Sequence, residues 1–112
     1  GQTITALYEV ILSTNLSASP YAQFDFRYKK PNENESRLLT HTVNNIPSTI
    51  ESSSENMRFA ASVTAFGLLM KQSAHKGTAD KQMVLNLGSG AKTFDPNGYR
   101  EQFISIVNKW KP

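Results

Sequence analysis

Apolar and polar residues alternate along the first third of the chain, which is typical of half-buried β-strands. The alternation predicts strands over residues 3–13, 21–30 and 37–44. The run "PNENES" between the second and third segments has the composition of a turn, so these two segments are expected to form an antiparallel hairpin. The first segment is apolar on one face and mixed on the other, with Leu7 and Ile11 among its polar residues. The residues of its apolar face are Ile4, Ala6, Tyr8, Val10 and Leu12.

After Pro47 the spacing of apolar residues changes from two to three or four, which predicts a helix over residues 54–73. Ser52 and Glu55 have the Ser-x-x-Glu spacing of a capping box at its start. Apolar side chains occupy nearly every side of this helix, so we expect it to be buried. They are Phe59, Ala60, Ala61, Val63, Ala65, Phe66, Leu68, Leu69 and Met70.

Gly67 interrupts this apolar run in the middle of the predicted helix. A glycine inside a helix costs about 1 kcal/mol relative to alanine. Its presence predicts that another element approaches closely at this point. The final helix is the expected neighbour, because Tyr99, Phe103 and Trp110 provide the bulk that would require a small residue. On this hypothesis, Gly67→Ala destabilises the domain.

Two shorter helices are predicted to follow. The first covers residues 80–88, with Met83, Val84 and Leu87 on one face, and ends near Gly88 to Gly90. The second begins at Asp95 as N-cap, with Pro96 in the first helical position. Its expected apolar stripe consists of Tyr99, Phe103, Ile106, Val107 and Trp110. The predicted fold is therefore α+β: a small antiparallel sheet of about three strands packed against about three helices.

Length and charge narrow the classes of function. The 112 residues fit one domain, 1–112, and the net charge of +3 comes from basic and acidic residues interspersed along the chain. A nucleic-acid-binding domain would gather its cations on one element. The nearest candidate, "FRYKKP", has only Arg27, Lys29 and Lys30 around Tyr28, so we expect no nucleic-acid binding. No run approaches the roughly 18 apolar residues of a membrane span, and the first residues do not resemble a signal peptide. We expect an excised domain of a longer protein.

No pattern of catalytic or metal-binding residues is found. The chain has no cysteine, which excludes disulfides and thiolate sites, and its histidines, His41 and His75, lack metal-ligand spacing. The "GSG" at residues 88–90 matches neither a P-loop, nor a Rossmann fingerprint, nor a serine elbow, and is expected to terminate a helix. Four glutamates are expected to serve solubility and capping: Glu33, Glu35, Glu51 and Glu55. We therefore predict no catalytic residue, no cofactor and no metal ligand, and no binding residue can be named.

Two tripeptides match the acceptor pattern for N-glycosylation. They are Asn15-Leu16-Ser17 and Asn34-Glu35-Ser36. Such tripeptides occur by chance in a chain rich in asparagine and serine, and they matter only in a eukaryotic secretory pathway.

Five separated segments resemble, in their order and spacing, the C-terminal domain of bacterial von Willebrand factor type A (VWA) domain proteins. They are "TALYEV" at 5–10, "FRYKKP" at 26–31, "RFAASVTAFGLLMKQS" at 58–73, "KG" at 76–77 and "DPNGYREQFISIV" at 95–107. The resemblance implies an exported parent protein, often a membrane-anchored lipoprotein, with a VWA domain ahead of this one. It therefore implies an extracytoplasmic location. The Asp-x-Ser-x-Ser metal motif of VWA domains is absent from these 112 residues, so the resemblance brings no metal ligand.

On this basis we expect a non-enzymatic accessory or protein-interaction domain that supports or orients the VWA module. Its expected partners are the VWA domain of the same chain and an unidentified envelope protein, without direct membrane insertion. The alternative is a ligand-binding module for a small molecule or a glycan. Such a module requires a pocket where polar and aromatic groups converge. The available tyrosines are Tyr8, Tyr21, Tyr28 and Tyr99.

Overall fold

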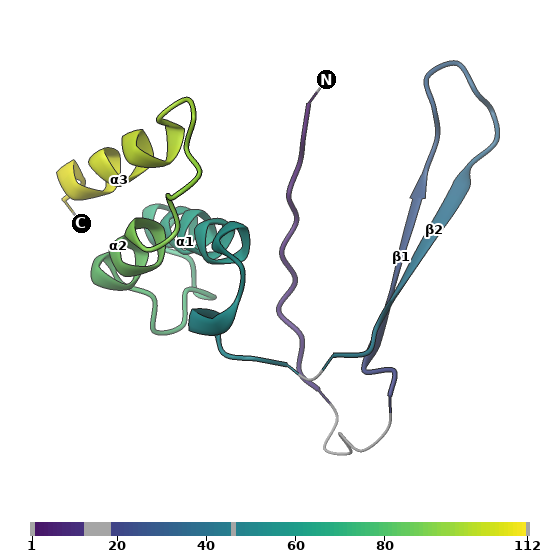
Figure 1. Cartoon of the computed structure of the whole chain (residues 1–112), viewed down its shortest axis with the longest axis horizontal. Coiled ribbons are helices and arrows are strands. Elements are labelled where there is room, and N and C mark those ends of the chain that lie inside the picture. Colours follow the sequence, from purple (N-terminus) through teal and green to yellow (C-terminus); the bar gives the residue numbers. More distant parts are fainter. Residues whose placement is uncertain (1, 13–18, 46, 112) are drawn as a thin grey trace. The chain divides into compact units, whose positions relative to one another are not determined.

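A computed structural model describes residues 2–12, 19–45 and 47–111. The chain divides into two compact units. One is built from Gly1–Tyr8 together with Ser48–Pro112 and contains the helices, and the other is built from Glu9–Pro47 and contains a β-hairpin (Figure 1). The described residues thus have an α+β composition, with a two-stranded antiparallel sheet and three α-helices, which confirms the predicted class.

The hairpin consists of β1, Ala22–Tyr28, and β2, Arg37–Val43, within the ranges predicted from the alternation. The antiparallel register places Phe26 opposite Leu39. Asn32, in the connecting turn, has a φ of 65°, a left-handed conformation that asparagine tolerates better than most residues. An exposed ion pair of 2.9 Å between Arg37 and Glu33 closes the turn.

The predicted first strand is wrong for the described part of residues 3–13. Residues 2–12 form neither helix nor strand, and residue 13 lies outside the described residues. Ile4 and Ile11 are 87% and 99% exposed. The alternation of side chains specifies the two faces of a strand, but a strand also requires a hydrogen-bonded neighbour, which the sequence pattern does not reveal.

The central helix, α1, covers Glu55–Met70 and is preceded by a short 3₁₀ turn at Ile50–Ser52. The predicted capping box is wrong. Ser54 is the N-cap, and its hydroxyl accepts a hydrogen bond of 3.2 Å from the backbone N–H of Met57. Ser52 is not available as the cap because it belongs to the 3₁₀ turn.

Burial of α1 is limited to one side, so the prediction of burial on nearly all sides is also wrong. Ser62 and Phe66 are buried, whereas Val63 and Met70 are 43% and 58% exposed. The neighbours of α1 in its own unit cover one face of it. One side of α1 is therefore buried and the other is exposed, although apolar residues occupy nearly all sides of the helix.

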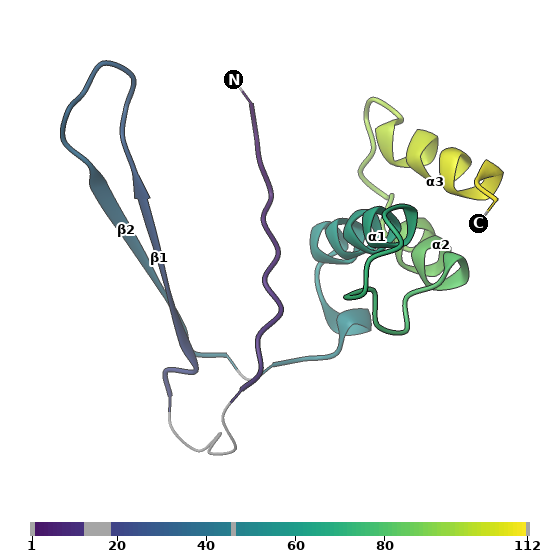
Figure 2. The same ribbon diagram turned by 180° about the vertical axis from the view of Figure 1, so that it is seen from behind.

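Helix α2, Lys81–Ser89, packs beside α1, and α3, Tyr99–Lys109, completes the helical unit (Figure 2). The core comprises the buried side chains of Phe66, Val84 and Val107. The Phe66 ring meets Phe103 and Trp110 edge to face, at centroid distances of 5.7 and 5.5 Å. These contacts join α1 to α3. No helix of the described residues is long and apolar enough to cross a membrane.

One buried hydrogen bond crosses from α1 to α2. The Ser62 hydroxyl, fully buried, donates to the backbone carbonyl of Val84 at 2.7 Å. A buried hydroxyl without a partner would cost free energy of folding. This bond therefore favours the position in which α1 and α2 pack here.

At Gly88, and not at Gly67, the close approach of neighbouring elements requires a residue without a side chain. A Cβ added at Gly88 would overlap Ile104 Cδ1 and lie 2.9 Å from Ser62 Oγ, whereas a Cβ at Gly67 would meet nothing within 4 Å. The prediction that the final helix crosses at Gly67 is therefore wrong. The close approach exists, but it is made at α2, where α1 and α3 both contact Gly88.

The start of α3 differs from the prediction by a few residues. Gly98, with a φ of 69°, is the N-cap, while the Asp95 carboxylate accepts from the backbone N–H groups of Arg100 and Glu101 at 3.2 and 3.0 Å. Asp95 lies four residues before Tyr99, the first residue of α3, and still binds the free backbone N–H groups of that helix. A left-handed φ favours glycine, which explains the residue at position 98.

The apolar stripe of α3 is correspondingly shifted. Tyr99 and Ile106 are 69% and 58% exposed, contrary to the prediction, whereas Ile104 is buried with Val107. In α2 the predicted face is right for Val84, but Met83 is 38% exposed.

Candidate functional site

The titratable residues singled out from the sequence are dispersed in the structure. His41 lies on β2 and His75 in the loop after α1. Within residues 2–12, 19–45 and 47–111, no group of three or more acidic or histidine side chains gathers as a metal ion would require. The absence of a metal ligand stays a prediction.

The four glutamates of the sequence analysis have different surroundings. Glu33 pairs with Arg37 in the hairpin turn, and Glu55 binds Thr93 in the helical unit. Glu51 lies in the 3₁₀ turn, and Glu35 is exposed near the hairpin turn. Glu33 and Glu55 are therefore each engaged by a different partner.

Polar contacts fasten the loop between α2 and α3 onto the first turns of α1. The Glu55 carboxylate accepts hydrogen bonds from the Thr93 hydroxyl at 2.7 Å and from the Thr93 backbone N–H at 3.2 Å. The Arg100 guanidinium donates to the carbonyl of Ala91 and to Asn56 Oδ1, each at 2.5 Å. These contacts hold the loop in a fixed position against α1.

Arg58 acts in the same way from the first turn of α1. Its guanidinium donates to the carbonyl of Gly90 at 3.1 Å and to the carbonyl of Ser53. A cation near a helix N-terminus is unfavourable with respect to the helix dipole. Both Arg58 and Arg100 occupy first turns, and this is the signal by which the sequence could have indicated that they serve tertiary contacts.

The two carboxylates that bind this loop and the start of α3, Glu55 and Asp95, both have lowered pKa values. The Thr93 hydroxyl, followed by its backbone N–H, lowers the pKa of Glu55 below its ordinary value in spite of partial desolvation. Desolvation alone would raise the pKa of Asp95, but hydrogen bonds from the backbone N–H groups of Glu101, Arg100 and Tyr99 together outweigh it and lower the pKa. Both carboxylates are ionised at neutral pH, which suits acceptors of hydrogen bonds and does not suit proton donors.

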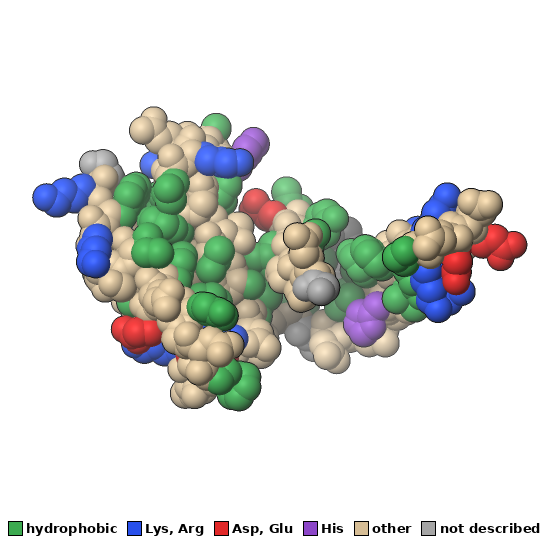
Figure 3. Space-filling model, turned by 90° about the horizontal axis from the view of Figure 1, so that it is seen from above, with side chains coloured by type: hydrophobic (Ala, Val, Ile, Leu, Met, Phe, Trp, Pro, Cys, Tyr) green, Lys and Arg blue, Asp and Glu red, His purple; other side chains and the backbone are tan. Residues whose placement is uncertain are grey.

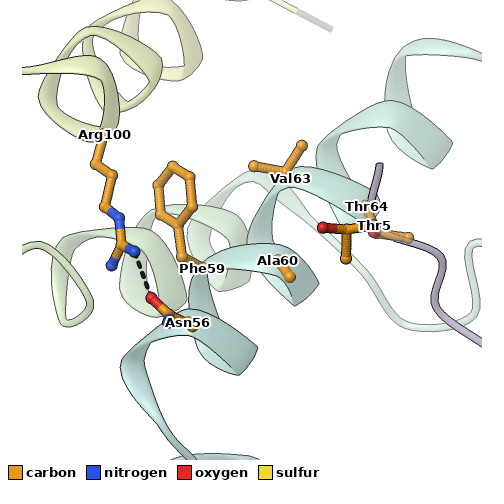
Figure 4. A pocket seen from close by; sticks show the side chains of 7 residues that line it. All are labelled: Thr5, Asn56, Phe59, Ala60, Val63, Thr64 and Arg100. Atoms are coloured by element: carbon orange, nitrogen blue, oxygen red, sulfur yellow. Dashed lines mark hydrogen bonds between the residues drawn. The ribbon is translucent and has the colours of Figure 1, made fainter. Parts of the chain in front are cut away.

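A pocket of about 450 Å³ lies along α1 beside the start of α3 (Figure 4). The Arg100 guanidinium stands 4.9 Å from the centre of the Phe59 ring at one end of it. The pocket is partly open to solvent, and its one charged side chain already donates to Asn56 and Ala91. The residues that line it are Thr5, Asn56, Phe59, Ala60, Val63, Thr64 and Arg100.

This pocket includes none of the tyrosines on which the ligand-binding alternative depends. Tyr99 is 69% exposed outside it, and Tyr28 stacks on Phe26 in the hairpin at a centroid distance of 6.2 Å. The aromatic and polar groups that the pocket does contain, Phe59, Asn56 and Arg100, already contact one another.

The most distinctive surface belongs to the hairpin. Directly paired residues share a face of an antiparallel sheet, so Phe26 lies beside Leu39, and Ala22 beside Val43. The other face is mostly polar. We call the first side the apolar hairpin face, which comprises Ala22, Phe24, Phe26, Tyr28, Leu39, His41 and Val43, with Arg37 opposite Tyr28 at its end.

Phe26 and Leu39 are 50% and 58% exposed, so these two side chains of the apolar hairpin face are only partly covered. Figure 3 shows apolar side chains along the hairpin, with the charged side chains gathered at its tip. The sequence predicted the alternation that makes this face, but it also predicted that helices of the chain cover the sheet. That packing stays a prediction, because the hairpin and the helices belong to different units.

Comparison with known proteins gives a family without an assigned activity. Residues 13–112 match the family described as "Uncharacterized protein YfbK, C-terminal". The chain is 34% identical over 86 residues to the "Uncharacterized protein YfbK" of Escherichia coli (strain K12). This match covers 77% of the chain but 14% of the E. coli protein, so the chain spans a small part of that relative. No solved structure matches the chain. With nearly all of its length matched, the chain belongs to the family of YfbK C-terminal domains, whose function is uncharacterized.

Proposed function

We propose that the chain is a non-enzymatic accessory domain of a longer bacterial cell-envelope protein, in which it supports or orients a VWA module. The observation that carries this proposal is the exposure of the apolar hairpin face. Phe26 and Leu39, directly paired, each leave about half of their surface in contact with solvent.

An isolated two-stranded hairpin is at best marginally stable in water, and it becomes stable when its apolar face packs against another layer. Large exposed apolar patches on soluble proteins mark interaction surfaces. The apolar hairpin face therefore fits the role of a surface that another module covers.

The comparison with the E. coli relative supports a partner in the same polypeptide. The match covers 14% of that protein, and the family is named for a C-terminal position. A relative of this kind has ample additional chain to cover the hairpin. The identification of that partner as a VWA module, and the extracytoplasmic location with a membrane-anchored parent, follow from the sequence resemblance and are part of the proposal.

The proposal is tested by measuring association between the 112-residue chain and the preceding part of the longer protein, prepared separately. Calorimetry is expected to show one-to-one binding that the double variant Phe26→Ser, Leu39→Ser weakens at least tenfold. The matched control is Asp25→Asn with Thr40→Ser, a directly paired couple on the polar face, which should leave binding unchanged. Circular dichroism verifies that each variant keeps its helices. Equal weakening by both double variants, or no binding at all, would refute the proposed docking role.

A further inference from the structure

Residues 3–11 have the pattern of a β-strand but no strand structure in the described chain. The sheet of the described residues contains β1 and β2, and residues 2–12 form neither helix nor strand. They run as an extended trace (Figure 1). Ile4 and Val10 are 87% and 67% exposed on one face of the pattern, and Ile11 is 99% exposed on the other. The strand pattern is therefore present, although none of these residues belongs to a strand of the described chain.

The family match places this segment at a boundary. The match begins at residue 13, so residues 2–12 precede the part of the chain that defines the family. In the E. coli relative, most of the protein lies outside the matched part. A segment in this position is the connection to whatever precedes the C-terminal domain.

We infer that residues 3–11 are a β-strand that adds to the exposed edge of a sheet in the preceding part of the same polypeptide. The inference rests on the proposed function, because it requires the chain to be one module of a longer protein. Addition of an extended segment to a sheet edge satisfies its backbone N–H and C=O groups, while its side chains enter pockets on alternate faces.

The side chains also specify the kind of sheet. In a strand, Ile4, Ala6 and Val10 would point to one face, whereas Leu7 and Ile11 would lie among the polar residues of the other. A strand with apolar side chains on both faces belongs in a sheet that is covered by other layers on both sides. The partner is therefore the edge of a sheet with cover on both faces, and not the outer edge of a solvent-facing hairpin.

Residue-resolved hydrogen exchange of the intact longer protein tests this inference. At a sheet edge, successive amides point alternately toward the partner and toward solvent. One alternating set of amides within residues 3–11 should therefore exchange about tenfold or more slowly than in an unstructured peptide. Exchange at the unprotected rate throughout residues 3–11 would overturn the inference. If the amides of β1 and β2 nevertheless exchange more slowly in the longer protein than in the 112-residue chain, the proposed docking role stands while this strand does not.

Proline substitutions at two adjacent positions provide the matched control. Proline lacks the N–H donor, so Ala6→Pro and Leu7→Pro remove donors that point to opposite edges. One of the two should abolish the slow exchange of residues 3–11, and the other should preserve it. Retention of slow exchange in both variants would show that protection does not arise from strand pairing. Protection that increases with protein concentration, together with dimers in sedimentation, would assign the pairing to a second copy and overturn the inference.

Discussion

Replacing Gly88 by alanine tests the packing of the three helices at its tightest point. The added Cβ would overlap Ile104 Cδ1 and approach Ser62 Oγ to 2.9 Å. Ile104 is 6% exposed, so its side chain has little space into which it can move. Ser62 is held by its hydrogen bond to the Val84 carbonyl, and a shift of Ser62 would lengthen that bond.

Three contributions determine the expected loss of stability. Adding a methyl group to a filled core costs about 1–3 kcal/mol, and weakening the buried hydrogen bond adds up to about 1 kcal/mol. Alanine in place of glycine recovers at most about 1 kcal/mol of helix propensity, and less at Gly88, which is the next-to-last residue of α2. The net destabilisation should be about 1–3 kcal/mol.

The assay is urea unfolding followed by the fluorescence of Trp110, the chain's one tryptophan, which packs against Phe66 and so reports on the helical unit. Gly67→Ala is the matched control on α1, because its Cβ meets nothing within 4 Å. It should raise the stability by up to about 1 kcal/mol. The two glycine substitutions are therefore expected to have opposite signs.

A second variant identifies the atom responsible. Ile104→Val removes Cδ1 and should cost about 0.5–1.5 kcal/mol by itself, but Gly88→Ala should then cost less in its presence than in the original chain. A Gly88→Ala protein as stable as the original, or strictly additive effects of the two substitutions, would refute the packing described at Gly88.

Three further substitutions test the core and its polar anchor. Phe66→Ala should destabilise the helical unit by about 3–5 kcal/mol in the same urea assay, since it empties the centre of the core. Ser62→Ala should cost about 1 kcal/mol by removing the buried donor to the Val84 carbonyl, and an unchanged midpoint would show that this bond contributes nothing. Thr93→Val should raise the pKa of Glu55 toward its usual value of 4.5, as measured by an NMR titration. The lowered pKa of Glu55 contributes stability above its unfolded pKa that is lost as the pH falls through the folded pKa, so Thr93→Val should show a smaller loss of stability on acidification below about pH 4.5.

The elements of the fold could be predicted because their signals are local. Alternation over residues 21–30 and 37–44 depends only on which side chains face each side of a ribbon, and both strands formed there. Helix periodicity likewise located α1, α2 and α3. The exact starts could not be predicted, because Ser52, Ser53 and Ser54 are successive serines, and the 3₁₀ turn decides which one caps α1.

Features that depend on how the helices pack against one another could not be predicted from the sequence. Gly67 and Gly88 both interrupt apolar helical patterns, and only the packing of α1 and α3 against α2 shows which of them needs to be small. The residue that crowds Gly88 is Ile104, which the sequence pattern did not place on the apolar stripe of α3. The candidate surface was predictable in part. The alternation specified the apolar hairpin face, but it does not tell which part of the protein covers that face.

Thiol accessibility on the hairpin tests the central claim most directly, that another module of the longer protein covers the apolar hairpin face. The 112 residues contain no cysteine, so Leu39→Cys introduces a single thiol on that face and Thr40→Cys introduces one on the polar face, with any thiols elsewhere in the longer protein replaced. We predict that Leu39→Cys reacts rapidly with a thiol reagent in the 112-residue chain and at least tenfold more slowly in the longer protein, while Thr40→Cys reacts rapidly in both. Equal rates for Leu39→Cys in the two proteins would contradict the account. Slow reaction already in the 112-residue chain would contradict it as well, because the chain's own helices would then cover the hairpin.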